Sequence, residues 1–206
     1  MITNPLNDLA EIRSIMERST KFLSLSAASA VLAGVYALAG AALAWRIIYK
    51  SPTLLYEPLK EQLITPETSP LFIIAAAVFL LAAGTATWLS YRKAHAAGQK
   101  LWNRAAIRLI VNFALPLLAG GIFVMLLYFR GFYSLMASST LLFYGMALLN
   151  AGNFTFSDIR LLGVSEIALG LLAAALPGQG LLFWALGFGV LHIVYGGVMY
   201  WKYEKK

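Results

Sequence analysis

Long apolar stretches alternate with short polar segments along this chain of 206 residues. A helix needs about 20 predominantly apolar residues to cross the ~30 Å hydrocarbon layer of a bilayer. Six stretches approach or exceed that length, and they cover residues 22–43, 70–91, 109–129, 132–152, 159–176 and 181–201. The pattern predicts an all-α fold in which a single membrane domain, residues 1–206, forms a bundle of six transmembrane helices.

The composition agrees with a protein whose surface faces lipid. Apolar residues make up 60% of the chain and charged residues 12%, whereas soluble domains are about 45–50% apolar and about 25% charged. One soluble core in a chain of this length could not bury so many apolar side chains. Trp45, Trp88 and Trp201 stand at the ends of stretches, where membrane proteins place interfacial rings. We therefore expect the lipid bilayer to be the main partner of the chain.

Basic residues are distributed unevenly between the two sides of the predicted bundle. If the N-terminus is cytoplasmic, the outer side holds only four of the 16 Lys and Arg residues, namely Arg46, Lys50, Lys60 and Arg130. Cytoplasmic loops of membrane proteins carry an excess of Lys and Arg, so the pattern predicts that both termini are cytoplasmic. The net charge of +7 is then mainly a topology signal, with attraction to anionic lipid headgroups as a modest addition. We expect no nucleic-acid partner.

Several basic residues lie in the predicted cytoplasmic loop at 92–108. Arg92, Lys100, Arg104 and Arg108 are separated by multiples of four residues, so they would share one face if the loop were helical. Such a basic stripe could contact anionic lipid headgroups or an acidic cytoplasmic partner. The alternative is ordinary enrichment of basic residues on the cytoplasmic side, with long side chains that extend to the interface.

The first 21 residues have the pattern of an amphipathic helix. Asn4 and Pro5 suit the N-cap and the first helical position, and Leu9 and Ile12 fall on one stripe at helical spacing. We therefore expect residues 5–21 to form an interfacial helix on the cytoplasmic surface. The segment lacks the apolar core of a cleavable signal.

Small residues recur along one face of several stretches, as they do where membrane helices pack closely. The positions are Ser26, Ala30 and Gly34 with Ala33, Ala37 and Ala41 in the first stretch, Gly120 and Gly121 in the third, Gly163, Gly170 and Ala174 in the fifth, and Gly187, Gly189, Gly196 and Gly197 in the sixth. We expect contacts between helices of one chain there, although one face could serve a homo-oligomer. The pattern Thr155-x-x-Asp158 also predicts a capping box at the start of the fifth stretch.

The third and sixth stretches share a faint likeness. Phe113-Ala-Leu-Pro in one corresponds to Trp184-Ala-Leu-Gly in the other, and their ends read Tyr128-Phe129-Arg130 and Tyr200-Trp201-Lys202. A duplication of three plus three helices would place the two halves in inverted topology, as in many transporters. The few matching residues leave this question open.

One acidic residue, Glu166, lies inside a predicted span. An ionisable side chain there costs roughly 2.5–3.5 kcal/mol on insertion scales, so it is a functional hypothesis by default. The same cytoplasmic half holds His192, Tyr195, Asn112 and Asn150, judged by a rise of ~1.5 Å per residue. In one interpretation these residues line a cytoplasm-facing cavity in which Glu166 binds a cation or exchanges a proton with His192. In the other, Glu166 ties helices together and the remaining side chains complete its hydrogen bonds.

The residue types exclude several kinds of site. There are no cysteines and only two histidines, so thiolate chemistry is ruled out and no residue set completes a zinc site. The sequence contains no zinc-protease motif, nucleophile elbow, nucleotide loop or pair of carboxylates within one span. We therefore expect a non-enzymatic protein without a cofactor.

Three segments resemble a family of bacterial six-helix membrane proteins. They are Leu162-Gly-Val-Ser-Glu-Ile-Ala-Leu-Gly-Leu-Leu-Ala, Phe183-Trp-Ala-Leu-Gly-Phe-Gly-Val-Leu-His-Ile-Val-Tyr-Gly and Glu11-Ile-Arg-Ser-Ile-Met-Glu-Arg-Ser-Thr-Lys. The resemblance implies a bacterial inner membrane, but that family has no assigned activity and offers no site residues to carry over. Two functions therefore compete. One is transport or permeation of a proton, cation or small solute at Glu166, and the other is an accessory or regulatory role in which the basic stripe binds a partner.

Overall fold

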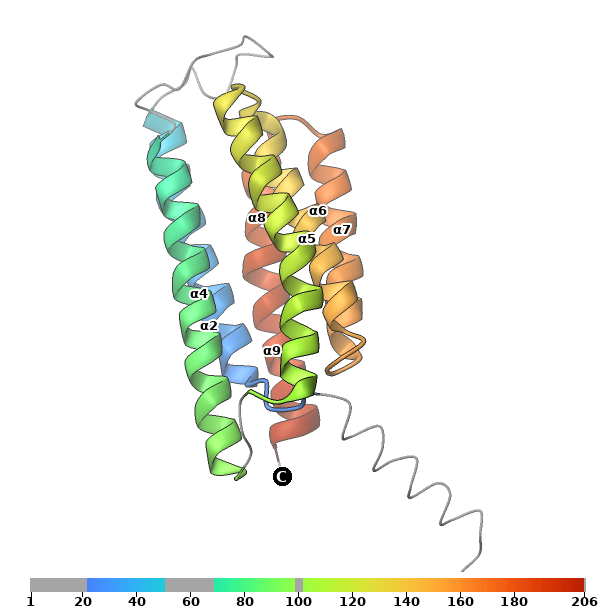
Figure 1. Ribbon diagram of the computed structural model, residues 1–206. Helices are drawn as coiled ribbons and strands as arrows, with labels where there is room; N and C mark the ends of the chain where they lie inside the picture. The colour runs from blue at the N-terminus through green and yellow to red at the C-terminus, as the bar shows by residue number, and fades with distance from the viewer. Residues whose placement is uncertain (1–21, 51–68, 99–101, 206) are drawn as a thin grey trace, which may run out of the picture.

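The computed structural model describes residues 22–50, 69–98 and 102–205. Within these ranges all regular structure is helical and forms six rods (Figure 1). Five of them are α2 (Ala27–Lys50), α4 (Ser69–Ala96), α5 (Arg104–Phe129), α6 (Met136–Ala151, after the 3-10 turn η1 at Tyr133–Leu135) and α7 (Asp158–Ala175). The sixth, called the C-terminal helix below, runs through α8 (Gly180–Trp184), the π-helical η2 (Ala185–Leu191), α9 (His192–Met199) and the π-helical η3 (Tyr200–Glu204). The prediction of an all-α protein with six helices is confirmed.

Five helical segments of the described chain are long and apolar enough to cross a membrane. They are Ala27–Ile47, Pro70–Ala96, Arg104–Phe129, Tyr133–Ala151 and Gly180–Glu204. The exception is α7, whose 18 residues include Asp158, Arg160 and Glu166. Large apolar side chains on the outer surface are widely exposed, and Leu80, Leu115 and Leu161 are between 68% and 73% accessible. Exposed apolar surface on this scale marks contact with lipid rather than water.

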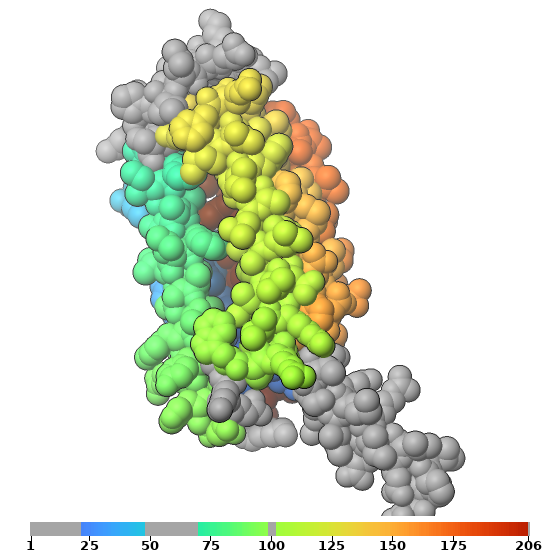
Figure 2. All heavy atoms as spheres, in the orientation of Figure 1, coloured from blue at the N-terminus to red at the C-terminus, as the bar shows by residue number. Residues whose placement is uncertain are grey.

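The helices pack in the spatial order α4, α2, C-terminal helix, α7, α6, α5, and the C-terminal helix also contacts α6. Consecutive helices run in opposite directions, so α2, α5 and α7 are antiparallel to the other three (Figure 1). Figure 2 shows that the molecule is hollowed between α4 and α5, with atoms of the C-terminal helix in dark red at the bottom of the hollow. The C-terminal helix is therefore the central element of the bundle.

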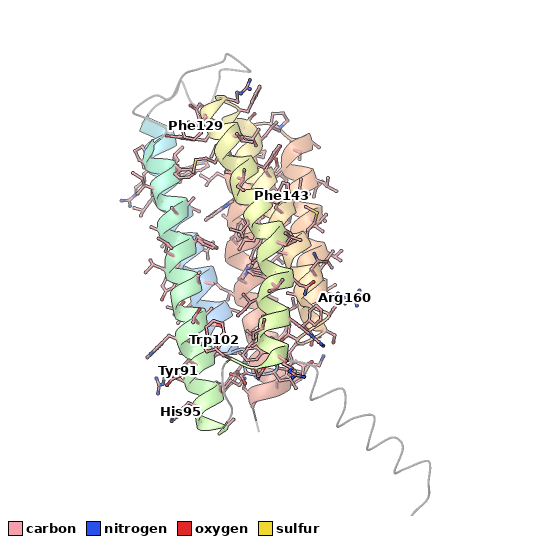
Figure 3. The ribbon with its side chains drawn as sticks, in the orientation of Figure 1. Tyr91, His95, Trp102, Phe129, Phe143 and Arg160 are labelled. Atoms are coloured by element: carbon pink, nitrogen blue, oxygen red, sulfur yellow. The ribbon has the colours of Figure 1, made fainter. Side chains whose placement is uncertain are left out.

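One end of the bundle, called the basic end below, gathers most of the described basic residues. It is the end where α4 stops, α5 and α7 begin and the chain terminates (Figure 1). These segments carry Arg92, Lys93, Arg104, Arg108, Arg160, Lys202 and Lys205. Exposed rings mark both ends, because Figure 3 places Tyr91 and Trp102 at the basic end and Phe129 at the opposite end. Charged and aromatic residues thus bracket the apolar length of the helices.

The first helix begins later than the sequence predicts. Residues 22–26 are not helical, because the Phe22 N–H donates to the Phe154 carbonyl at 2.8 Å and the Phe22 carbonyl accepts from Thr155 Oγ1 at 2.6 Å. These bonds attach the chain to the segment between α6 and α7 before α2 starts at Ala27. Because the Thr155 hydroxyl donates to the Phe22 carbonyl and does not cap α7, the predicted capping box is wrong. Ser157 is the N-cap of α7 and makes no side-chain cap bond.

The predicted basic stripe does not lie on one helix. After α4 ends, Gly98 adopts a φ of +65°, and the Asn103 side chain caps α5 by accepting from the Ala106 N–H at 2.8 Å. The turn separates Arg92 on α4 from Arg104 and Arg108 on α5. Residues 97–98 and 102–103 are not helical, so the continuous helix on which one shared face depends does not form. Lys100 and the interfacial helix predicted at 5–21 lie outside the described residues.

Candidate functional site

Glu166 is fully buried in the middle of α7, at 0% exposure. Neither carboxylate oxygen has a hydrogen-bond partner among the described residues. The carboxylate is accommodated by Gly187 of the C-terminal helix, because a Cβ on that glycine would overlap Glu166 Oε2 and lie 2.6 Å from Leu141 Cδ2. Buried polar groups normally find partners. A buried carboxyl group with no hydrogen bond to either oxygen among the described residues therefore needs an explanation.

His192 is the side chain nearest to this carboxylate for which a contact is resolved. Its Nδ1 atom lies 3.4 Å from Glu166 Oε1 and 3.0 Å from the Gly187 carbonyl oxygen. On the other side of the ring, Nε2 lies 2.8 Å from the Tyr144 hydroxyl. These partners favour the tautomer in which Nδ1–H donates to Gly187 and Nε2 accepts from Tyr144. His192 therefore connects Glu166 on α7 with Tyr144 on α6.

The π-helical segment η2 shapes this part of the site. Gly187 and His192 are five residues apart, and the ring of the second contacts the carbonyl of the first. A π-helical turn joins residues at that spacing, and π-bulges occur frequently at functional sites. Gly187 and Gly189 both lie in η2, and glycine has a low preference for regular helix. The glycines thus permit the local change of helical pitch and leave room for Glu166.

Aromatic rings enclose the site on the side of α5 and α8. The Tyr144 ring lies 5.0 Å from Phe188 and 5.9 Å, edge to face, from Phe113. Phe188 in turn lies 5.1 Å from Trp184 and 6.0 Å from His192. Rings at these separations shield this side of the site from bulk solvent, and the low local dielectric strengthens any charge interaction inside.

Of the other residues singled out in the sequence, the two asparagines lie elsewhere and Tyr195 lies beside the site. Asn112 donates to the Arg108 carbonyl of its own helix at 2.8 Å, and Asn150 is exposed. Tyr195 packs in the same cluster as Tyr144, and its hydroxyl is buried without a described partner. Sequence reasoning missed Tyr144. The available signal was a tyrosine in the interior of a span, away from the interfacial ends where the other rings stand.

Two helix crossings hold the site in place, and they share one glycine arrangement. A Cβ on Gly34 of α2 would lie 2.6 Å from the Gly189 carbonyl oxygen, and a Cβ on Gly145 of α6 would lie 2.6 Å from the Gly163 carbonyl oxygen. Each crossing continues with an isoleucine on the partner helix, Ile193 or Ile167, against the same glycine. The contact of α2 with the C-terminal helix therefore repeats that of α6 with α7.

The repeat extends to the sequence. The C-terminal helix reads Gly189-Val-Leu-His-Ile-Val-Tyr-Gly196 and α7 reads Gly163-Val-Ser-Glu-Ile-Ala-Leu-Gly170. The shared pattern is Gly-Val-x-(His/Glu)-Ile-x-x-Gly, so His192 and Glu166 occupy equivalent positions. Because α2 and α6 run in opposite directions, as do the C-terminal helix and α7, the two crossings are inverted (Figure 1). This likeness links the fifth and sixth helices, whereas the sequence drew attention to the third and sixth.

Several of the predicted small-residue contacts are present at these crossings, whereas Ala174, which was also predicted to make contact, is exposed. Gly170 packs against Leu142 and the Ser138 carbonyl, and Gly196 packs against Val31 and the Ala27 carbonyl. Gly121 and Gly197 face open space, because a Cβ added at either position would meet nothing within 4 Å. Contact at these two positions was predicted wrongly, because each adjoins a glycine that takes the packed face.

No metal centre accompanies the site within the described part of the chain, where no three His, Cys, Asp or Glu side chains gather. Comparison with known proteins gives no further guide, since no family model, curated protein or solved structure matches this chain. The resemblance to a bacterial six-helix family therefore stays a prediction. The findings support an all-helical protein with five candidate membrane spans.

Proposed function

We propose that this chain is a non-enzymatic protein of the bacterial inner membrane that transports a proton, cation or small solute, with Glu166 as the group that binds it. One observation carries the proposal. Glu166 is completely buried among helices that face lipid, and both carboxylate oxygens lack a hydrogen-bond partner among the described residues. An ionisable group in that position is costly and marks a functional site more often than a structural one.

The orientation follows from the charges. Positive-inside distribution assigns the basic end to the cytoplasm, and it places both termini there. In this arrangement α7 completes the set of six spans. Asp158 and Arg160 stand at its cytoplasmic end, and the Arg160 side chain points away from the bundle (Figure 3), whereas Glu166 packs inside, where lipid does not reach it.

The chemistry of the site favours binding of a positive species. An ionised carboxylate in apolar surroundings is unfavourable unless it is paired, and a proton or a cation at Glu166 would neutralise it. His192 lies close enough to supply or accept a proton through Nδ1. Its tie to Tyr144 keeps the ring oriented.

Purified protein in proteoliposomes tests this proposal. Glu166→Gln keeps the size and removes the titratable group, so we expect ion-driven flux to fall at least tenfold while the unfolding midpoint in detergent stays close to that of the wild type. Ser165→Ala is the matched control, because Ser165 is adjacent and its hydroxyl donates to the Leu161 carbonyl of its own helix. An inactive wild type, or undiminished flux in the Gln variant, would refute the proposal.

The competing accessory role depends on the basic residues rather than on Glu166. Arg92 stacks over Trp88 at 5.1 Å, and it lies on a different helix from Arg104 and Arg108. A dispersed set of arginines is ordinary for the cytoplasmic side. A wild type without flux, together with loss of a co-purifying partner in the double variant Arg104→Gln, Arg108→Gln, would reverse the preference.

A further inference from the structure

Polar groups continue from the buried site toward the basic end. Tyr195 lies on the C-terminal helix, three residues after His192. Its ring packs on the cluster of Leu148, Ile159 and Leu162, which Tyr144 also contacts. It packs equally on the cluster of Ala27, Phe156 and Met199, which Tyr203 contacts. Tyr195 therefore stands between the site and the end of the molecule.

The Tyr195 hydroxyl is an unexplained group. It is buried and has no hydrogen-bond partner among the described residues. A buried tyrosine hydroxyl usually has one, and leaving it unbonded costs stability without any packing benefit that phenylalanine would lack. A role for the hydroxyl other than holding the fold would account for its presence.

The basic end supplies the next polar groups. The Tyr203 hydroxyl donates to Asp158 Oδ2 at 2.6 Å, and Lys202 Nζ lies 2.9 Å from Asp158 Oδ1. The Asp158 side chain is 26% exposed, so it meets the surrounding water. Asp158, with Tyr203 beside it, is therefore a partly exposed group at the basic end that can accept a proton.

We infer that Tyr195 and Tyr144 carry protons between the basic end and the His192–Glu166 pair. This inference rests on the proposed function and specifies it, since it names the proton as the transported ion and the basic end as its point of entry. The route leads from Asp158 and Tyr203 through Tyr195 to Tyr144, with water joining the hydroxyl groups.

Each transfer conserves protons. A proton that reaches the Tyr144 oxygen binds as that hydroxyl passes its own proton to Nε2 of His192. The imidazolium then gives its Nδ1 proton to Oε1 of Glu166, 3.4 Å away. One proton has entered, the carboxylate has become a carboxylic acid, and Tyr144 is neutral again. Release by the reverse sequence restores the starting tautomer.

The walls of the route select against larger ions. Both tyrosines pack on the cluster of Leu148, Ile159 and Leu162, whose side chains are 6% to 7% exposed. Apolar walls offer no oxygen ligands to replace the hydration shell of a metal cation. A proton needs no such shell, because it passes between hydrogen-bonded oxygens.

Tyr195→Phe tests the inference, with Tyr200→Phe as the matched control on the same helix, where the ring is 55% exposed. Proton flux is followed with a pH-sensitive dye in proteoliposomes. A second readout is the rate at which the Glu166 carboxyl protonates after a pH jump, followed by infrared spectroscopy and assigned with Glu166→Gln. We expect Tyr195→Phe to slow both at least tenfold, as befits loss of a positioned proton carrier, and Tyr200→Phe to change neither. The unfolding midpoint of Tyr195→Phe should not fall, because the substitution removes no hydrogen bond to a described residue.

The two readouts separate the possible failures. If Glu166→Gln abolishes flux while Tyr195→Phe retains wild-type flux and protonation rate, the route is wrong and the proposed function stands. If the wild type carries no protons but Tyr195→Phe still slows protonation of Glu166, the route stands and the transport role falls. Equal protonation rates in all variants that retain Glu166 would overturn the inference.

Discussion

The crossing of α6 with α7 and the crossing of α2 with the C-terminal helix share their glycine packing but carry different ionisable side chains. Gly145 receives the Gly163 carbonyl in one, and Gly34 receives the Gly189 carbonyl in the other. At the matching position one helix carries an acid and the other a base, and these side chains meet at 3.4 Å. The comparison separates the glycines that pack the helices, which are repeated, from the two ionisable side chains, which are not.

α7 and the C-terminal helix also differ in backbone geometry. α7 is regular along its length, whereas the C-terminal helix becomes π-helical before His192. Small residues allow close helix approach in a bilayer, where no hydrophobic effect draws helices together. The repeated glycines supply that approach, and the π segment adds the room for a carboxylate.

The largest expected effect comes from exchanging the two unlike groups. His192→Glu alone places two carboxyl groups together in apolar surroundings and deprives the Tyr144 hydroxyl of its partner, and each unsatisfied buried polar group costs about 1–3 kcal/mol. The double variant Glu166→His, His192→Glu restores one acid and one base at equivalent positions. We expect it to recover more than half of the lost free energy of unfolding, measured by denaturant titration in detergent. A double variant as unstable as the sum of the two single variants would show that the crossings are not equivalent.

A smaller effect probes the shared glycines. Gly34→Ala and Gly145→Ala each push a Cβ to 2.6 Å from a backbone carbonyl oxygen, and overpacking of this kind costs about 1–3 kcal/mol. We expect similar losses at the two sites, measured by the same denaturant titration. Gly121→Ala and Gly197→Ala are the controls, since the added methyl meets nothing within 4 Å and alanine gains up to about 1 kcal/mol of helix propensity. Tolerance of alanine at only one crossing would break the equivalence.

The smallest effect concerns the acid at the start of α7. The hydrogen bond from Tyr203, with Lys202 beside it, holds the pKa of Asp158 below its usual value of 3.8. Because the folded pKa is lowered, the ionised carboxylate contributes stability above the unfolded pKa of about 3.9, and that contribution is lost as pH falls through the folded pKa. We expect Asp158→Asn to be slightly less stable than the wild type at neutral pH, as measured by thermal unfolding in detergent. The difference should vanish at the acid end of the folded range, and a constant difference would count against the assignment.

Sequence reasoning captured what depends on local pattern. The apolar lengths predicted six helices, and the cost of a charge in lipid singled out Glu166. Contacts between segments far apart in the sequence could not be predicted in this way. Residues 22–26 are not helical because Phe22 forms hydrogen bonds with Phe154 and Thr155. The sequence around Phe22 contains no signal for these bonds. Tyr144 and the π segment are likewise defined by neighbours on other helices, and Asn112 could not be seen to bond its own helix.

The central claim is that Glu166 gains and loses a proton while the protein stays folded. Infrared difference spectroscopy across a pH titration measures this directly, because a carboxylic acid and a carboxylate absorb at different positions. We expect a carboxyl band that appears and disappears reversibly with pH in the wild type and is absent in Glu166→Gln. Because the chain has nine Asp and Glu residues, the contradicting result is that the wild type and Glu166→Gln give identical spectral changes over the whole range in which the fold persists, which would leave Glu166 as a fixed tie between helices.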